Sequence, residues 1–303
     1  MNKMMNFTII IPHKNIPLLL DRMIKSIPMR DDLEIIVVDD HSDACVVEQL
    51  RNLERENLSL ILNQECHGAG YARNCALPLA KGKWVLFADS DDFFNSGFND
   101  FLNDYTDSDA DVIYFNANSV DTVTFEPSNR VDHLHEFIEE YHKDKNKGDL
   151  IMRYLFTEPW CKMVKREIIE SYQIKFEETS IRNDVKYSYL VGHYAANIIV
   201  DDRQLYCVTT RQNSLSRGKG YQAALDELKV FAGWKKFFVV HKIPLELPKF
   251  DLCAYNFTRH LWKDNKLFRV EYGKMREGGL SHRFIIGQIL KYIYKSMSYK
   301  ILG

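Results

Sequence analysis

The sequence predicts an α/β protein with a mainly parallel sheet and helices on both faces. Short apolar runs rich in β-branched residues alternate with segments whose apolar residues recur at helical spacing, which is the pattern of β-α-β crossovers. The runs are apolar throughout, as expected of strands that are covered on both faces. Three runs end in polar residues, and ligands of such sheets bind outside the carboxyl ends of the strands.

Five strands and three helices are expected in the first part of the chain. The strands are residues 7–11, 34–38, 58–62, 84–88 and 111–115. The first should stop at Pro12, and the second should stop at Asp39 and Asp40. Apolar residues at helical spacing predict helices over 18–27, 46–53 and 72–80, the last interrupted by Pro78.

The pattern becomes more helical after about residue 120. Helices are expected over 131–154, 159–171 and 187–196, a strand begins at 197–200, and the chain is mostly helical from Tyr221 onward. Because no repeat or low-complexity linker marks a border, the boundary near residue 220 rests on this change of pattern. We expect an α/β domain over residues 1–220 and a helical region over 221–303.

Composition and charge exclude several classes of protein. The 303 residues carry a formal net charge of −2, so the electrostatic footprint of a nucleic-acid partner is missing. None of the six cysteines forms a C-x-x-C pair, and scattered cysteines suggest reduced thiols in the cytosol. We find neither the pattern of a signal peptide nor a run of eighteen apolar residues, and we therefore expect a cytoplasmic protein.

Three carboxylates crowd the end of the strand 84–88. Asp89, Asp91 and Asp92 lie within four residues and should repel one another. A divalent cation would relieve this repulsion, and Mg²⁺ typically binds one or two carboxylates together with substrate phosphates. The polar ends of the strands 7–11 and 34–38 should converge on the same edge of the sheet. A solvated acidic turn is the alternative interpretation of the cluster.

Six segments in the same order resemble motifs of the family 2 glycosyltransferases, of the type that builds bacterial surface polysaccharides. The segments are Val37–Asp43, Gly68–Asn74, Asp89–Asp92, Pro159–Met163, Asn183–Val185 and Arg211–Ser216. Each is weak alone, but their order is specific, and the resemblance covers roughly Asn6–Arg217. It implies the Rossmann-like GT-A fold over residues 1–220. It also implies an inverting transfer from a nucleotide sugar, most commonly a UDP-sugar, to a saccharide or lipid-linked saccharide.

The resemblance implies roles on the nucleotide side of the site. The loop Pro12–Asn15 would pack beside the nucleotide. Asp39 would accept a hydrogen bond from the base, and Asp40 lies next to it. Arg73 would meet the nucleotide or a phosphate, because its forked donors suit oxyanions. Alternatively, Asp39 and Asp40 cap the helix that follows them.

The resemblance also assigns the acidic cluster. Asp89 would approach the ribose or the diphosphate, and Asp91, together with Asp89, would ligate Mn²⁺ or Mg²⁺. Asp92 is expected to be structural. A purely structural ion pair between Arg73 and Asp89 or Asp91 is the alternative.

On the acceptor side, the resemblance makes Asp184 the general base. The alternative is that Asp184 caps the helix through Tyr187. Trp160 is expected to form part of the wall of the acceptor site. Asn183 stands beside Asp184 on the acceptor side, at a position where the family often has Glu.

Four histidines lie in positions where a functional role is conceivable. His13 and His41 lie in the predicted donor loops, but no role carries over to them, and His41 stands where the family commonly has Gly. The alternating pair His133 and His135 would suit a metal, but no third ligand is evident. We expect both to be surface residues.

The C-terminal segment Leu280–Gly303 has the pattern of a basic amphipathic helix. It carries four basic residues and no acidic one, and its apolar residues recur every three or four positions. Such a helix either docks on the protein core or lies on an anionic membrane surface.

Three other functions compete with glycosyl transfer. A binding protein of the same fold that has lost turnover is supported by Asn183 alone. A dinucleotide-dependent oxidoreductase does not fit, because Gly68-Ala69-Gly70 lacks the third glycine of the fingerprint and the first turn has none. A nucleotidyltransferase would leave the segments around Trp160 and Asp184 unexplained.

Overall fold

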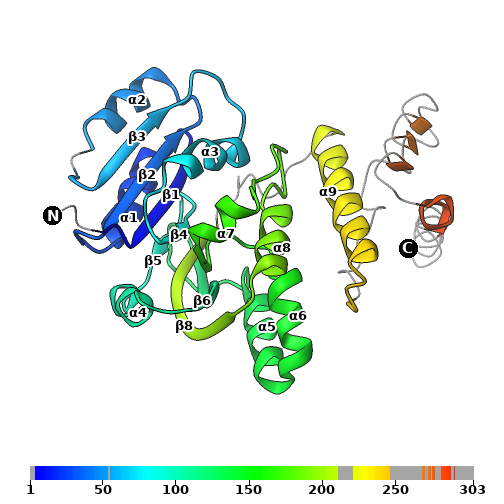
Figure 1. The fold of residues 1–303 in the computed structure, drawn as a ribbon. Helices are drawn as coiled ribbons and strands as arrows, with labels where there is room; N and C mark the ends of the chain where they lie inside the picture. The colour runs from blue at the N-terminus through cyan, green and yellow to red at the C-terminus, as the bar shows by residue number, and fades with distance from the viewer. Residues whose placement is uncertain are drawn as a thin grey trace. The chain divides into compact units, whose positions relative to one another are not determined.

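The computed structural model describes residues 4–53, 55–210, 221–245, 268–269, 272–273, 275–276, 281–287 and 290. The chain divides into two compact units (Figure 1). The first comprises Met1–Glu178 and Asn183–Ser214, and the second comprises Thr179–Arg182 and Leu215–Gly303. Among the described residues, no helix combines the length and the apolar character needed to cross a bilayer.

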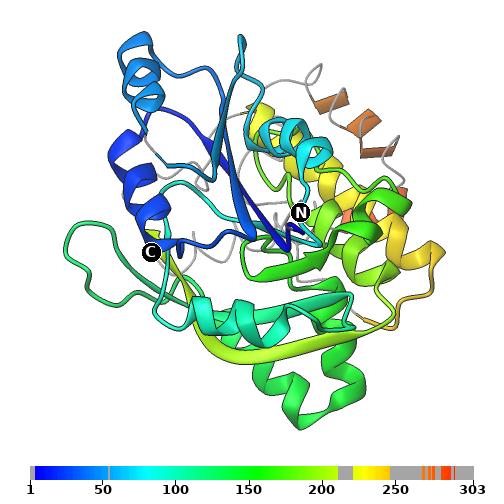
Figure 2. The same ribbon diagram turned by 60° about the vertical axis from the view of Figure 1, so that its left-hand side comes forward.

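The first unit is built on one eight-stranded sheet. Its strands stand in the order β3 (Leu58–Leu62), β2 (Leu33–Asp39), β1 (Phe7–His13), β4 (Trp84–Phe87), β7 (Lys162–Lys165), β6 (Val112–Asp121), β8 (Ile198–Thr210) and β5 (Phe93–Phe94). Six strands run in one direction, and β7 and β5 run against them. The predicted mainly parallel sheet is confirmed. Figure 2 shows β8 as a long curved strand, which pairs with β6 along most of its length.

Eight helices of the first unit surround this sheet. They are α1 (Pro17–Ser26), α2 (Ala44–Arg51), α3 (Ala69–Ala76), α4 (Phe98–Tyr105), α5 (Asp132–Lys143), α6 (Lys145–Tyr154), α7 (Arg166–Ser171) and α8 (Val185–Tyr194). The strand residues of β1, β2 and β4 are almost all buried, as their continuous apolar character predicts. As expected, the helix is interrupted near Pro78: α3 ends at Ala76, and the chain continues as a 3₁₀ turn over Leu77–Leu79.

Several predicted elements were wrong in extent or type. β1 continues through Pro12 to His13, which is possible because Pro12 lies beyond Ile10, the last residue paired with β4. The predicted helix over 131–154 breaks at Asp144, whose side chain caps α6. The predicted helix over 159–171 is a helix only from Arg166, and its first part is β7. The two-residue strand β5 was not predicted.

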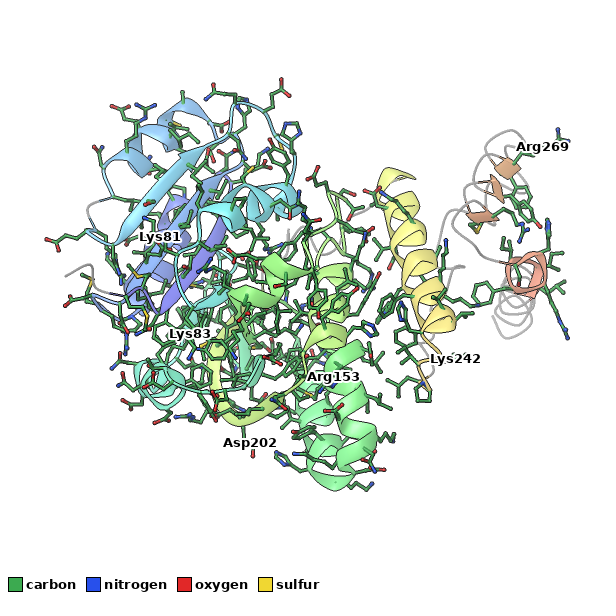
Figure 3. The ribbon with its side chains drawn as sticks, in the orientation of Figure 1. Lys81, Lys83, Arg153, Asp202, Lys242 and Arg269 are labelled. Carbon is green, nitrogen blue, oxygen red and sulfur yellow. The ribbon has the colours of Figure 1, made fainter. Side chains whose placement is uncertain are left out.

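The position of α8 is set by its contact with α6. The guanidinium of Arg153 donates from α6 to the carbonyls of Gly192 at 2.9 Å, Ala195 at 2.5 Å and Ala196 at 3.2 Å (Figure 3). A side chain at Gly192 would collide with the backbone of Arg153, since its Cβ would lie 2.1 Å from the carbonyl oxygen. This contact fixes the helix that begins directly after Asp184.

In the second unit, α9 (Tyr221–Val240) is the longest described helix. Ala232 of α9 is buried in a small apolar cluster with Met275 and Ile285. The Ser180 hydroxyl and amide donate to Asp226 at 2.6 and 2.8 Å, which ties the segment Thr179–Arg182 to α9. Most of 280–303 and the whole of Arg211–Ser216 lie outside the described residues.

Candidate functional site

The polar ends of β1, β2 and β4 meet at one edge of the sheet. These three strands are parallel neighbours, and His13 at the end of β1 stands opposite Asp39 at the end of β2. The segment Asp89–Asp92 follows β4 at the same edge. The expected convergence of the three strand ends is therefore confirmed.

Asp39 is a buried carboxylate with three donors. His13 Nδ1 lies 2.8 Å from Asp39 Oδ1, and Ser42 donates from its hydroxyl at 2.5 Å and from its amide at 2.9 Å. The ring of His13 accepts from the amide of Ile16 through Nε2 at 3.2 Å, which places the proton on Nδ1. Burial by itself would raise the pKa of Asp39, but the bonds from His13 and Ser42 hold that pKa below its ordinary value.

Asp40 holds the loop that leads into α3. Its carboxylate accepts from the amide of His67 at 2.9 Å and from that of Gly68 at 2.8 Å. Gly68 has φ of +90°, a conformation that glycine adopts at little cost. The alternative in which Asp39 or Asp40 caps the next helix is wrong, because the N-cap of α2 is Asp43 and makes no side-chain capping bond.

The loops after β1 and β2 are joined to each other. The amide of Asn15 donates to Ser42 Oγ, and Asn15 Oδ1 accepts from the amide of Asp43, both at 2.8 Å. Pro12 is buried within β1. His41 has φ of +61°, which explains why a glycine would suit this position equally well.

The acidic turn after β4 is anchored on β8. Asp92 is buried and accepts from the amide of Thr209 at 2.7 Å. The carbonyl of Asp91 accepts from Thr209 Oγ1 at 2.5 Å and from the guanidinium of Arg22. Burial raises the pKa of Asp92 well above its ordinary value, and the charges of Asp91 and Asp89 raise it further. The charges of Asp91 and Asp89 therefore disfavour a further negative charge on Asp92.

This arrangement fits a cation that takes part of its ligands from a substrate. Among the described residues, no three His, Cys, Asp or Glu side chains are placed to hold a metal ion together. Asp89 and Asp91 both retain solvent exposure, whereas Asp92 is buried. Two carboxylates are enough for Mg²⁺ or Mn²⁺ when a diphosphate supplies further oxygens.

Arg73 connects the acidic turn to the segment before α8. Its side chain is only 6% exposed, and Nη2 donates to Asp89 Oδ1 at 2.6 Å. Nη1 donates to Asn183 Oδ1 at 2.8 Å, and the guanidinium lies over the ring of Phe176. The alternative of an ion pair with Asp89 is therefore realised in this structure.

Close packing brings residues 176–178 and Asn183 against α3. A Cβ at Gly70 would lie 2.1 Å from the carbonyl oxygen of Glu177, so only glycine fits. The side chain of Asn74 bonds to the backbone of Phe176 in both directions, at 2.9 and 3.1 Å. These contacts place Asn183 within reach of Arg73.

Asp184 occupies the N-cap position of α8 without making a side-chain capping bond, so the capping alternative is not formed. The residue is partly exposed, yet desolvation of its carboxyl raises the pKa to about 6, against the effect of Arg73. The charges of Glu158 and Asp89 also raise it. A carboxyl with such a pKa is suited to general base catalysis near neutral pH.

A buried charged group beside Asp184 was not predicted. Lys162 is fully buried and donates to the carbonyls of Phe156 at 2.5 Å and Glu158 at 2.8 Å. Burial lowers the pKa of Lys162 to about 7, and the carboxylates of Glu158 and Asp184 oppose this shift. His133 donates to Glu158 at 2.9 Å and is partly exposed, so it is a surface residue with a partner.

Trp160 is almost buried, and its ring stacks on that of Tyr206 with centroids 5.1 Å apart. Tyr206 and Thr209 could not be predicted from local sequence patterns, because their partners lie more than one hundred positions away. Lys162 belongs to the motif segment Pro159–Met163, which gave the only local signal for it.

Comparison with known proteins identifies the family and several relatives of the chain. The model of the family "Glycosyl transferase family 2" matches residues 8–173. The chain is 40% identical over 63 residues to the UDP-Glc:alpha-D-GlcNAc-diphosphoundecaprenol beta-1,3-glucosyltransferase WfaP of Escherichia coli. These residues make up 21% of this chain and 25% of WfaP. The chain is 36% identical over 99 residues to the poly(ribitol-phosphate) beta-N-acetylglucosaminyltransferase TarS of Staphylococcus aureus. These residues make up 30% of this chain and 17% of TarS. The matched segments thus span a quarter or less of these two relatives.

Solved structures share the fold. A crystal structure of S. aureus TarS 1–349 in complex with UDP-GlcNAc superposes with a TM-score of 0.63 and 20% identity, covering 90% of this chain and 81% of that one. The mannosyltransferase PcManGT from Pyrobaculum calidifontis, in complex with GDP-Man and Mn²⁺, gives a TM-score of 0.53 at 14% identity, covering 100% and 82%.

The sheet order, the helices around it and the polar strand ends define a protein of the Rossmann-like GT-A fold. Since the family model matches more than half of its residues, the chain belongs to glycosyl transferase family 2.

Proposed function

We propose that the chain transfers a sugar from a nucleotide sugar, with UDP-sugars as the first candidates, to a hydroxyl of a saccharide or lipid-linked saccharide in polysaccharide synthesis. The observation that carries this proposal is the bridge made by Arg73. It joins Asp89 of the acidic turn to Asn183, the neighbour of a carboxyl suited to act as a base. The name of WfaP gives a UDP-linked glucose donor and a sugar on diphosphoundecaprenol as acceptor, which supports the same substrate classes.

On the donor side, the loop Pro12–Asn15 and the residues Asp39 and Asp40 would form the nucleotide pocket. Arg73 would contribute positive charge next to the phosphates. Asp89 and Asp91 would hold Mn²⁺ or Mg²⁺, and such an ion, when bound, stabilises the negative charge of the departing diphosphate.

On the acceptor side, Asp184 would take the proton of the attacking hydroxyl. The hydroxyl oxygen forms a bond to the anomeric carbon while the bond from that carbon to the diphosphate oxygen breaks, so the configuration inverts. Trp160 would line the acceptor site. Because the pKa of Asp184 is about 6, its carboxyl is mostly ionised at pH 7 and can accept this proton.

A donor assay tests this proposal. Thermal shift with a panel of nucleotide sugars and Mn²⁺ identifies the donor, and release of nucleoside diphosphate then measures turnover. Asp184→Asn should lower turnover by about 10²- to 10⁴-fold and leave donor binding intact. Asp202→Asn is the matched control, since the side chain of Asp202, which is labelled in Figure 3, is 67% exposed.

Two results would contradict the proposal. Unchanged turnover in Asp184→Asn would remove the base assignment. Donor binding without any release of nucleoside diphosphate would favour the alternative of an inactive nucleotide-sugar-binding protein, which Asn183 in place of Glu supports.

Calorimetry addresses the metal separately. Asp91→Ala should lose the metal-dependent part of UDP binding, because Asp91 would be a direct ligand. Equal UDP affinity with and without Mn²⁺ in the unaltered protein would count against the metal.

We also propose a catalytic domain over 1–220 and a helical region over 221–303 that contacts the inner face of the cell membrane through 280–303. Ile285 is buried in its own unit, whereas Ile286 and Leu290 are 49% and 60% exposed. Exposed apolar residues beside basic ones suit an anionic bilayer surface. Flotation with anionic liposomes should decrease in I286D/L290D and after truncation at Leu280, and equal flotation of all three proteins would exclude this contact.

A further inference from the structure

We propose that Tyr206 is a positioning residue that sets both sides of the site. Its hydroxyl holds the acidic turn Asp89–Asp92, and its ring supports Trp160 on the acceptor side. The inference rests on the proposed function, because the turn is assigned there to the donor and its metal.

The hydroxyl of Tyr206 lies between two residues of the turn. The amide of Asp89 donates to Tyr206 Oη at 2.8 Å, and the carboxyl of Asp92 lies close to the same phenolic hydroxyl. Tyr206 is fully buried, and Asp92 is 3% exposed. Water therefore cannot easily take the place of the hydroxyl if it is removed.

The ring of Tyr206 is held on two sides. Trp160 stacks on it with an interplanar angle of 11°, and Phe94 meets it edge-on with centroids 5.2 Å apart. Phe94 also pairs with Tyr206 in the β5–β8 ladder, and the amide of Asn95 donates to the carbonyl of Leu205 at 2.9 Å. The strand that follows the acidic turn is thus bound to β8 at the position of Tyr206.

One side chain therefore connects groups that the sequence places far apart. Without the hydroxyl, the amide of Asp89 loses its partner in a dry environment, and the turn should relax. The carboxylates of Asp89 and Asp91 would then be held less firmly toward a metal. Residues that orient metal ligands in this way typically affect metal affinity by about 10- to 100-fold.

Tyr206→Phe isolates the hydroxyl, because it keeps the ring against Trp160. In the full-length protein, Mn²⁺ should strengthen UDP binding about tenfold less in Tyr206→Phe than in the unaltered protein, while metal-free UDP affinity stays the same. Isothermal titration of UDP with and without Mn²⁺ measures both. The matched control is Tyr114→Phe, since Tyr114 is also fully buried and its hydroxyl lacks a partner among the described residues.

Hydrogen exchange gives a second readout that needs no nucleotide. Amides of the turn 89–92 should exchange faster in Tyr206→Phe than in Tyr114→Phe, and amides around Trp160 should change only in Tyr206→Leu, which removes the stacked ring. Thr209→Val, which deletes a different anchor of the same turn, should resemble Tyr206→Phe.

The two failures are distinguishable. If unaltered protein binds UDP without any effect of Mn²⁺, the metal assignment fails, and hydrogen exchange still decides the role of Tyr206. If Tyr206→Phe matches Tyr114→Phe in the exchange of the turn and in the effect of Mn²⁺, Tyr206 has no positioning role.

Discussion

The guanidinium of Arg73 lies 2.6 Å from a carboxylate oxygen of Asp89, although α3 and the end of β4 are separate elements. The second arm of the same guanidinium reaches Asn183. Because Asn183 is neutral, the bond from Arg73 to Asp89 is the only one of the two that pairs opposite charges. A glutamate at position 183 would compete with Asp89 for this cation.

Removal of Arg73 should weaken both the fold and the donor site. We expect Arg73→Met to lower the free energy of unfolding by about 2–3 kcal/mol, since the bonds to Asp89 and Asn183 involve a buried charged group. Arg73→Lys should not restore UDP binding, because an ammonium lacks the fork that spans both partners. Urea denaturation and UDP titration check these expectations.

The control for Arg73→Met is Lys25→Met, whose ion pair with Asp21 lies on the surface. Surface pairs contribute little, so its unfolding curve should coincide with that of the unaltered protein. If both variants lose the same free energy of unfolding, the buried bonds of Arg73 contribute no more to stability than a surface ion pair does.

Asp184→Asn should lower turnover and, above about pH 6, raise stability. The folded pKa of about 6 lies above the reference value of 3.8, so the folded state retains the proton longer than the unfolded state does. Stability of the unaltered protein therefore falls as pH rises from about 4 to about 6. Above pH 6 the variant should be more stable by on the order of 1–2 kcal/mol, a difference that disappears near pH 4.

Turnover of the unaltered protein should rise with pH through about 6, as Asp184 ionises. A pH–rate profile for nucleotide release measures this limb. A turnover rate that does not change with pH on either side of about 6 would show that Asp184 is not the general base.

Lys162→Met should remove a pH dependence of stability. The pKa of Lys162 is lowered from 10.5 to about 7, so the unfolded state binds more protons between these values, and stability rises with pH from about 7 upward. The buried thiol of Cys161, whose pKa is raised above 9.0, opposes the trend at higher pH. Thermal denaturation between about pH 7 and 9 should show a rise in the unaltered protein and none in the variant, whereas parallel curves would contradict the prediction.

Gly70→Ala should disrupt the contact between α3 and the segment that carries Asn183. The new Cβ would lie 2.1 Å from the Glu177 carbonyl oxygen, so one of the two backbones must move. We expect a lower melting temperature and a loss of turnover larger than the loss of stability explains. Overpacking of this kind typically costs about 1–3 kcal/mol.

Gly233→Ala is the matched helical control. Nothing lies within 4 Å of its added Cβ, and alanine favours a helix over glycine by about 1 kcal/mol. Its melting temperature should stay the same or rise, and a drop equal to that of Gly70→Ala would remove the steric explanation.

The strands that build the donor edge could be predicted because each is a continuous apolar run with a polar end. β1, β2 and β4 were found in this way, and parallel pairing then places their ends together. β7 escaped prediction because Lys162 opens it and its partners β4 and β6 come from other parts of the chain. The local pattern of Pro159–Ser171 favours a helix, but hydrogen bonding to β4 on one side and β6 on the other makes part of this segment a strand.

The sequence by itself determined the alternation of strands and helices, the three polar strand ends and the carboxylates Asp89, Asp91 and Asp92, because these depend on neighbouring residues. Tertiary structure alone decided the partners of Arg73, the burial of Lys162, the pKa of Asp184 and the place of Tyr206. Desolvation and Coulomb interactions depend on distances in space. Segments more than one hundred positions apart set those distances at this site.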